Sequence, residues 1–211
     1  MRKIPLIEGE YYHIYNRGVD KRDVFQDRDD LDRFFQSMKE FNVSEPIGSL
    51  YLNSFNENKE NKKQKKLVEF VAYCLNPNHF HILIKQVAEN GISEFMKRLS
   101  GGYTLYFNNK HKRTGSLFGG KFKSVHIDSD TYLLHVSAYI NLNNLFKGKK
   151  TNLSKSSWEE YIGKNGDNIC NKDIILAQFK NSKEYEKFAS DSLKDILERK
   201  ELDKELVDFN L

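Results

Sequence analysis

Two histidines, His79 and His81, flank a single bulky apolar residue, Phe80. Side chains alternate between the faces of a β-strand, so a strand here would direct both imidazoles to one face and Phe80 into a core. Two neighbouring imidazoles provide part of the ligand set of a divalent metal ion. The pair therefore indicates a metal site that needs a further ligand. The alternative is a pair of half-exposed strand histidines without a ligand.

A second group of chemically capable residues follows about 60 residues later. Tyr139 and Asn143 are four residues apart in a segment with helical periodicity, so they share a helix face, and His135 lies one turn earlier on that face. A tyrosine hydroxyl, with its usual pKa of about 10, is a poor nucleophile. Beside a metal, a phosphodiester is polarised enough for a tyrosine oxygen to attack it. The alternative for Tyr139 is a core aromatic residue of an amphipathic helix.

The strands that would hold these residues are visible in the sequence pattern. The segments Leu67–Leu75 and His79–Lys85 are apolar and favour strands, and Asn76-Pro77-Asn78 between them is a turn signal. Further strands are predicted over Tyr11–Arg17 and Phe122–Ile127. We therefore expect a hairpin with both histidines close to its turn.

Three helices are predicted among these strands. Apolar residues recur at helical spacing over Asp29–Phe41, and Ser93 is a candidate N-cap for a second helix. Asp128 or Ser129 would cap a third helix that runs to about Asn143.

The order β-α-β-β-α-β-α predicts the fold class. It is typical of an α+β protein with a ferredoxin-like antiparallel sheet and helices packed on one face. The open face would carry His79 and His81, and the last helix must pack near an edge of the sheet or on this open face. After it, the tail contains a tryptophan segment and further helices, so we expect a C-terminal helical extension.

The remaining segments are polar or basic. Residues 43–66 indicate a flexible insertion or hairpin tip, and Lys110–Gly120 is a glycine-rich basic loop. Residues 101–150 contain eight lysines and arginines against two acidic residues, whereas residues 151–211 contain ten basic and thirteen acidic ones. Cations interleaved with aromatic rings suit nucleic acid, because the cations neutralise phosphates and the rings stack on bases. The alternative is a solvated charged face. The loop cations are Lys110, Lys112 and Arg113.

Composition favours a protein of the reducing cytoplasm. No apolar run has the length of a membrane span, and the first residues lack the apolar core of a signal peptide. The two cysteines, Cys74 and Cys170, are far apart in the sequence, and Cys74 falls in an apolar strand as a small hydrophobic residue would.

Five segments of the chain occur in the order in which a known family has them. The chain resembles the single-tyrosine HUH transposases, in particular the REP-associated tyrosine transposase branch, over most of residues 10–190. The matching segments are Tyr12–Gly18 (YHIYNRG), Leu75–Ile84 (LNPNHFHILI), Gly115–Phe122 (GSLFGGKF), Tyr139–Asn143 (YINLN) and Trp158–Tyr161 (WEEY).

The resemblance implies a role for each matching residue. His79 and His81 correspond to the paired metal ligands, Tyr139 to the nucleophile and Asn143 to the additional polar ligand. The sequence departs from the family at Asn144, where the family usually has proline, and this affects the local turn more than the chemistry. The positions where the family contacts DNA or supports the site are Arg17, Lys121 and Lys123.

The resemblance also implies a function. The family is expected to cleave and rejoin single-stranded DNA at hairpin-forming repeats, with Mg²⁺ or Mn²⁺, through a 5′-phosphotyrosine intermediate, as a monomer or homodimer. Residues 1–150 would form the catalytic domain and residues 151–211 the extension. The alternatives are a catalytically silent nucleic-acid-binding module, a domesticated regulator on the same fold, and a metal-dependent phosphodiesterase that uses water.

Overall fold

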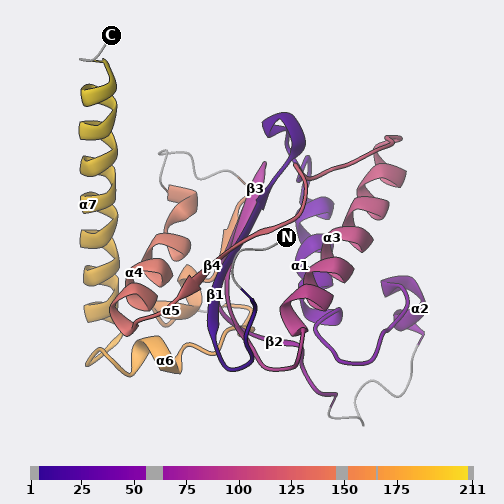
Figure 1. Cartoon of the computed structure of the whole chain (residues 1–211), viewed down its shortest axis with the longest axis horizontal. Helices are drawn as coiled ribbons and strands as arrows, with labels where there is room; N and C mark the ends of the chain where they lie inside the picture. The colour runs from indigo at the N-terminus through magenta and orange to yellow at the C-terminus, as the bar shows by residue number, and fades with distance from the viewer. Residues whose placement is uncertain (1–4, 56–63, 146–151, 165, 209–211) are drawn as a thin grey trace.

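A five-stranded sheet forms the centre of the computed structural model, which describes residues 5–55, 64–145, 152–164 and 166–208 (Figure 1). The strand order is β4-β1-β3-β2-β5, and each neighbouring pair is antiparallel. The bounds are β1 Tyr11–Arg17, β2 Val68–Asn76, β3 His79–Gln86, β4 Lys123–Ile127 and β5 Lys155–Ser156. The first four strands have the ferredoxin-like order, so the predicted fold class is confirmed.

Two long helices cover one face of the sheet. They are α1 (Arg28–Glu40) and α3 (Gly91–Lys110), which lie side by side in Figure 1. The alternating side chains of β1 and β3 that point to them form the larger apolar core, which includes Ile14, Phe80 and Ile82. Phe80 is therefore in the core, as the H-x-H alternation predicts.

Helix α4 (Asp130–Asn141) covers the other face of the sheet, where it packs on β2 and β3 (Figure 1). The last helix of the predicted order therefore packs on the open face of the sheet, as expected. A second core lies between α4 and the sheet and continues to the C-terminal helices. These helices are α5 (Trp158–Tyr161), α6 (Asp173–Leu176) and α7 (Ser182–Asp208).

The C-terminal segment contributes to this second core. Tyr161 and Tyr185 are fully buried, and the Tyr161 hydroxyl donates to the carbonyl of Val71 in β2 at 2.8 Å. Helix α7 packs along α4 and extends past it in Figure 1. Across the described residues, no helix combines the length and the apolar character needed to cross a membrane.

Several predicted helix boundaries differ from the structure. The N-cap of α3 is Asn90, in the left-handed region at φ 56°, and not Ser93. The first residue of the helix is glycine because a Cβ at Gly91 would lie 2.2 Å from the carbonyl oxygen of Leu67. Ser129 caps α4 by accepting from the Tyr132 amide, as predicted. However, α4 ends at Asn141, and the 3-10 turn η2 (Asn143–Leu145) follows it.

The insertion at residues 43–66 contains a short helix, α2 (Leu50–Ser54), which the sequence analysis did not predict. Residues 56–63 of this insertion lie outside the described part of the chain. A second 3-10 turn, η1 (Val19–Lys21), follows β1.

Candidate functional site

Strand register brings the two histidines to the face that α4 covers. His79 and His81 of β3 pair with Arg17 and Tyr15 of the neighbouring strand β1. His79 is half-buried, and 9% of His81 is exposed. Both rings lie near the end of the hairpin, with centroids 5.2 Å apart and planes nearly perpendicular.

The hairpin turn is held in place by main-chain hydrogen bonds. The amide of Gly18 donates to the carbonyl of Asn78 at 2.9 Å, and the amides of Val24 and Phe25 donate to the carbonyl of Pro77. Only glycine fits at position 18, because a Cβ there would lie 2.2 Å from the carbonyl oxygen of Arg22. The turn that precedes His79 is therefore fixed to the end of β1.

His79 makes polar contacts through both ring nitrogens. Its Nδ1 lies 2.6 Å from the Oδ1 of Asn78, which can only accept, so Nδ1 donates and Nε2 is the nitrogen that can carry a lone pair. This Nε2 lies 3.2 Å from Asn143 Oδ1 and 3.2 Å from the amide nitrogen of Asn76. The Asn76 amide also donates to Asn143 Oδ1 at 2.8 Å. Lone pairs of His79 and Asn143 thus converge around one amide group.

His81 is held by a third histidine that the sequence analysis did not single out. The Nε2 of His13, in β1, lies 2.8 Å from the Nδ1 of His81. Burial lowers the pKa of His13 to about 4, so the His13 ring is neutral near pH 7. Tyr15 also stacks on His81, with its ring centroid 5.8 Å from that of His81 and 5.1 Å from that of His13.

Tyr139 projects from α4 toward these rings. Its ring meets His81 edge-on at 5.5 Å between centroids, and His13 at 6.3 Å. Burial raises the pKa of the Tyr139 hydroxyl, and a hydrogen bond with the Asn143 side chain opposes this increase. The side chains of Asn143 and Tyr139 are thus in contact although Asn143 lies beyond the end of α4. Tyr139 is neutral near pH 7.

The donor atoms fit a small divalent cation. In an octahedral site with bonds of about 2.1 Å, neighbouring ligand atoms lie about 3.0 Å apart. Two lone-pair atoms, His79 Nε2 and Asn143 Oδ1, lie 3.2 Å apart. The Nδ1 atoms of both site histidines are engaged by Asn78 and His13, so Nε2 is the atom that each ring can offer. Imidazole nitrogen and amide oxygen suit Mn²⁺ or Mg²⁺.

A different cluster also has metal-ligand residue types. Asp27, Asp30 and His111 have ligand atoms within 4.8 Å of one another. The ammonium group of Lys110 already occupies this cluster, at 2.6 Å from Asp27 Oδ1 and 3.0 Å from Asp30 Oδ1. The Asp27 carboxyl has a lowered pKa mainly because Lys110 donates to it. The cluster connects the N-terminus of α1 to the C-terminus of α3, so it is an ion-pair network with its cation in place.

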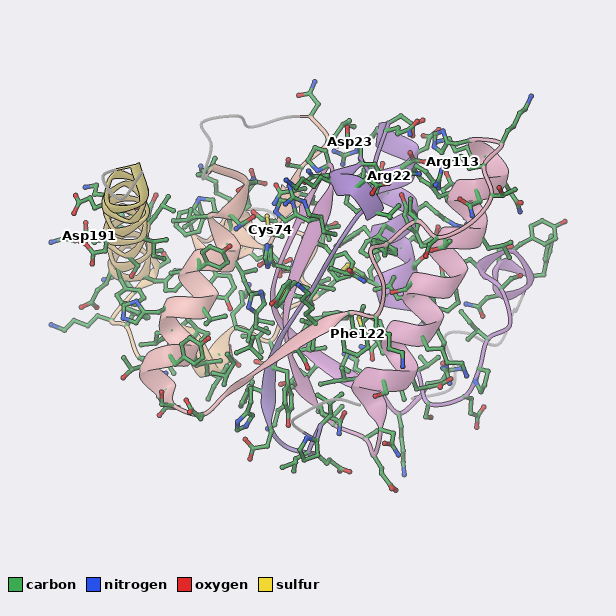
Figure 2. All side chains as sticks on the ribbon, turned by 45° about the horizontal axis from the view of Figure 1, so that its top comes forward. Arg22, Asp23, Cys74, Arg113, Phe122 and Asp191 are labelled. Carbon is green, nitrogen blue, oxygen red and sulfur yellow. The ribbon has the colours of Figure 1, made fainter. Side chains whose placement is uncertain are left out.

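The predicted DNA-binding residues occupy different environments. Arg17, Lys112, Lys121 and Lys123 are exposed. Lys110 is held in the ion-pair network, and Arg113 donates to Asn108 Oδ1 at 2.8 Å. In Figure 2 Arg113 lies at the end of α3, on one side of the sheet, while Cys74 lies on the side that faces α4.

Lys123 is a predicted DNA-binding residue that contacts the site. It pairs with Tyr15 across β4 and β1, and its ammonium lies 5.9 Å from the centroid of the Tyr15 ring. Because Tyr15 stacks on His81, a series of contacts connects this cation to the histidines.

Two predictions about single residues have different outcomes. Cys74 is fully buried as expected, and burial raises the pKa of its thiol to about 12. His135 does not join Tyr139 at the site. Its Nδ1 lies 3.2 Å from Ser192 Oγ of α7, and its ring packs against Phe188.

The position of His13 at the site could have been predicted from the alternation of β1, since it places residues 11, 13, 15 and 17 on one face.

The comparisons with known proteins agree on the fold. The family model described as "Transposase IS200 like" matches residues 7–143. Among solved structures, a REP-associated tyrosine transposase bound to a REP hairpin is similar to the chain at a TM-score of 0.50 and 12% sequence identity. The similarity covers 77% of this chain and 85% of that one. The comparison with curated proteins finds no match.

Proposed function

The chain belongs to the IS200-like transposase family, and we propose that it cleaves and rejoins single-stranded DNA with Tyr139 as the nucleophile. One observation carries this proposal. His79 and His81 come from β3, whereas Tyr139 of α4 and Asn143 of η2 follow about 60 residues later, yet all four meet on one face of the sheet. A half-buried tyrosine beside a divalent-cation ligand set is the arrangement that transesterification of a phosphodiester requires.

In the proposed reaction, the phenolic oxygen of Tyr139 forms a bond to the scissile phosphorus. The bond from phosphorus to the 3′ oxygen breaks, so a 5′-phosphotyrosine and a free 3′-hydroxyl result. Tyr139 loses its proton and the leaving 3′ oxygen gains one. In the reverse reaction a 3′-hydroxyl attacks the phosphotyrosine, and Tyr139 takes a proton again. One phosphodiester bond replaces another at each step, so no external energy source is needed.

His79, His81 and Asn143 are the residues that would hold Mg²⁺ or Mn²⁺, whose charge polarises the phosphate and aligns it. His13 and Asn78 orient the two imidazoles through their Nδ1 atoms. Tyr139 is held against His81 by packing, which limits the positions of its hydroxyl. Lys123, beside Tyr15, is placed to balance phosphate charge.

The proposed substrate is single-stranded DNA next to a hairpin. The solved relative with the hairpin supports this choice, as do the exposed cations Arg17, Lys112 and Lys121. Residues 1–150 are proposed as the catalytic part, and residues 151–211 as an extension that packs on it, which the second core supports. The proposed location is the cytoplasm.

Covalent attachment tests the proposal directly. The protein is incubated with Mn²⁺ and a library of labelled single-stranded hairpin oligonucleotides, and is then separated on a denaturing gel. We expect a metal-dependent band of protein that carries DNA. Tyr139→Phe should abolish this band while it preserves the fold and DNA binding. Tyr132→Phe is a matched control, because Tyr132 is in the same helix but is 39% exposed.

Other results would favour the alternative functions. Cleavage of DNA that persists in Tyr139→Phe would identify a phosphodiesterase that uses water. Strong DNA binding without a covalent band, across the whole library, would identify a binding module on the same fold. No feature of the described residues favours either alternative over the transesterification.

A further inference from the structure

Asn76 lies at the centre of the candidate site, although the sequence indicates only that it begins a turn. It is the last residue of β2, and it pairs with His79 across the hairpin, so both side chains are on the same face. Only 6% of Asn76 is exposed. Its side chain is therefore buried next to a residue that we propose as a metal ligand.

The amide nitrogen of Asn76 is surrounded by electron-pair donors. Asn143 Oδ1 lies at 2.8 Å, His79 Nε2 at 3.2 Å and the sulfur of Cys74 at 3.6 Å. An amide group has two hydrogens, so it cannot donate fully to three acceptors. The amide nitrogen thus occupies a position where lone pairs converge, which is also the position that a cation would prefer.

The hydrogen-bond network determines which way the Asn76 amide faces. His79 Nδ1 donates to Asn78 Oδ1, so His79 Nε2 accepts. Asn76 must therefore present its nitrogen, and not its oxygen, to His79 in this state. The oxygen receives the long hydrogen bond of Ser154 Oγ at 3.4 Å on the other side.

A divalent cation reverses this preference. The partial positive charge of the amide hydrogens would be repelled by the cation, whereas the amide oxygen is a good ligand for Mg²⁺ or Mn²⁺. We propose that Asn76 is a further ligand of the divalent cation, through Oδ1, and that its amide turns over between the metal-free and the metal-bound states. This inference rests on the proposed function, because it takes His79, His81 and Asn143 as ligands.

Two variants test the inference by metal affinity and not by activity. Free Mn²⁺ is counted by its EPR signal while the protein is titrated. Asn76→Ala should weaken Mn²⁺ binding roughly tenfold or more, because an oxygen ligand is lost. Asn76→Asp should strengthen it by a similar factor, because a carboxylate adds charge to the ligand set. Asp is close in shape to Asn, so a change in Mn²⁺ affinity in Asn76→Asp would not result from a change in packing.

Asn42→Ala is the matched control for the loss of a buried asparagine. Asn42 is also 6% exposed, and it bonds to the opposite end of β2, at the main chain of Leu67 and Val68. It should lower the melting temperature without a change in Mn²⁺ affinity. The melting temperatures of all variants are measured without metal, so that folding and binding are separated.

The results distinguish a ligand from other roles. Unchanged Mn²⁺ affinity in Asn76→Ala would overturn the inference and leave Asn76 as a hairpin residue. Tighter binding in Asn76→Ala would also overturn it, since the amide would then only obstruct the cation. If His81→Ala binds Mn²⁺ as well as the wild type, the ligand set of the proposed function fails too. Weaker binding in His81→Ala with no change in Asn76→Ala removes the inference alone.

Discussion

His13 Nε2 and His81 Nδ1 lie 2.8 Å apart, across two neighbouring strands of the sheet. For His81 to offer the lone pair of Nε2 to a cation, its Nδ1 must carry the proton and donate it to His13. His13 is neutral near pH 7 and can accept this proton in a hydrogen bond. A cation on His81 Nε2 therefore requires the tautomer of His81 that donates to His13.

His13→Ala is expected to weaken Mn²⁺ binding by roughly tenfold to a hundredfold, the usual effect of the loss of a residue that orients a metal ligand. His13→Gln should restore part of the affinity, because its amide oxygen accepts a hydrogen bond. EPR titration of free Mn²⁺ measures both. Equal affinities for the wild type and His13→Ala would show that His13 only packs against His81.

Lys110 is expected to be a structural cation, whereas Lys112 is expected to be a DNA-binding one. Lys110→Met should lower the free energy of unfolding by roughly 1–3 kcal/mol, because the fully buried Asp30 carboxylate loses a charged partner. Lys112→Met should leave stability unchanged, since Lys112 is exposed.

DNA binding is expected to weaken more in Lys112→Met than in Lys110→Met, the reverse of their order for stability. Lys112→Met should reduce the slope of log affinity against log salt by about 1, as the loss of one phosphate contact does. Urea unfolding and DNA titrations at several salt concentrations provide the two measurements. A loss of DNA affinity in Lys110→Met without any loss of stability would contradict the structural role.

Lys123 is expected to affect the rate of reaction more than other exposed cations. Lys123→Gln should slow the formation of the covalent complex roughly tenfold or more, because this charge lies beside Tyr15 at the site. Lys112→Gln is the matched control from the loop after α3. The comparison uses DNA at a saturating concentration, so that affinity does not contribute. Equal rates for the two variants would remove Lys123 from the site.

Alkaline pH should unfold the protein through its buried tyrosines. Burial raises the pKa of Tyr185 to about 12, and that of Tyr103 and Tyr161 further. Above a pH of about 10, the unfolded chain loses phenolic protons that the folded chain retains. The unfolded state then binds fewer protons, so stability falls as pH increases.

The buried tyrosines should therefore ionise only as the protein unfolds. Their phenolate absorbance should increase over the same pH range in which the circular dichroism of the folded protein is lost. Tyr161→Phe is expected to reduce the alkaline loss of stability, and the exposed Tyr51→Phe is its control. Ionisation of all tyrosines before any unfolding would contradict the prediction.

The part of the site that follows from local periodicity was predictable from the sequence. Strand alternation alone places His79 and His81 on one face with Phe80 in the core, and the observed hairpin has this arrangement. The ferredoxin-like order followed from the sequence of elements in the same way.

Relationships between distant residues were not predictable. His13 meets His81 because β1 and β3 are neighbours, and the pairing of strands depends on tertiary packing. Lys110 looked like a DNA ligand because its partners Asp27 and Asp30 are about 80 residues away in the sequence. Asn76 is also a common turn residue, so nothing in its sequence context indicates a contact with Asn143.

Because α4 packs on the sheet of its own chain, the residues of the proposed site are all present in one molecule. The tyrosine and both histidines belong to one polypeptide, and α4 is enclosed between that sheet and α7. With the proposed chemistry, one molecule then holds one nucleophile and can retain one severed DNA end at a time. To join two ends, a single molecule must act in consecutive rounds, or two complete molecules must come together on the same DNA.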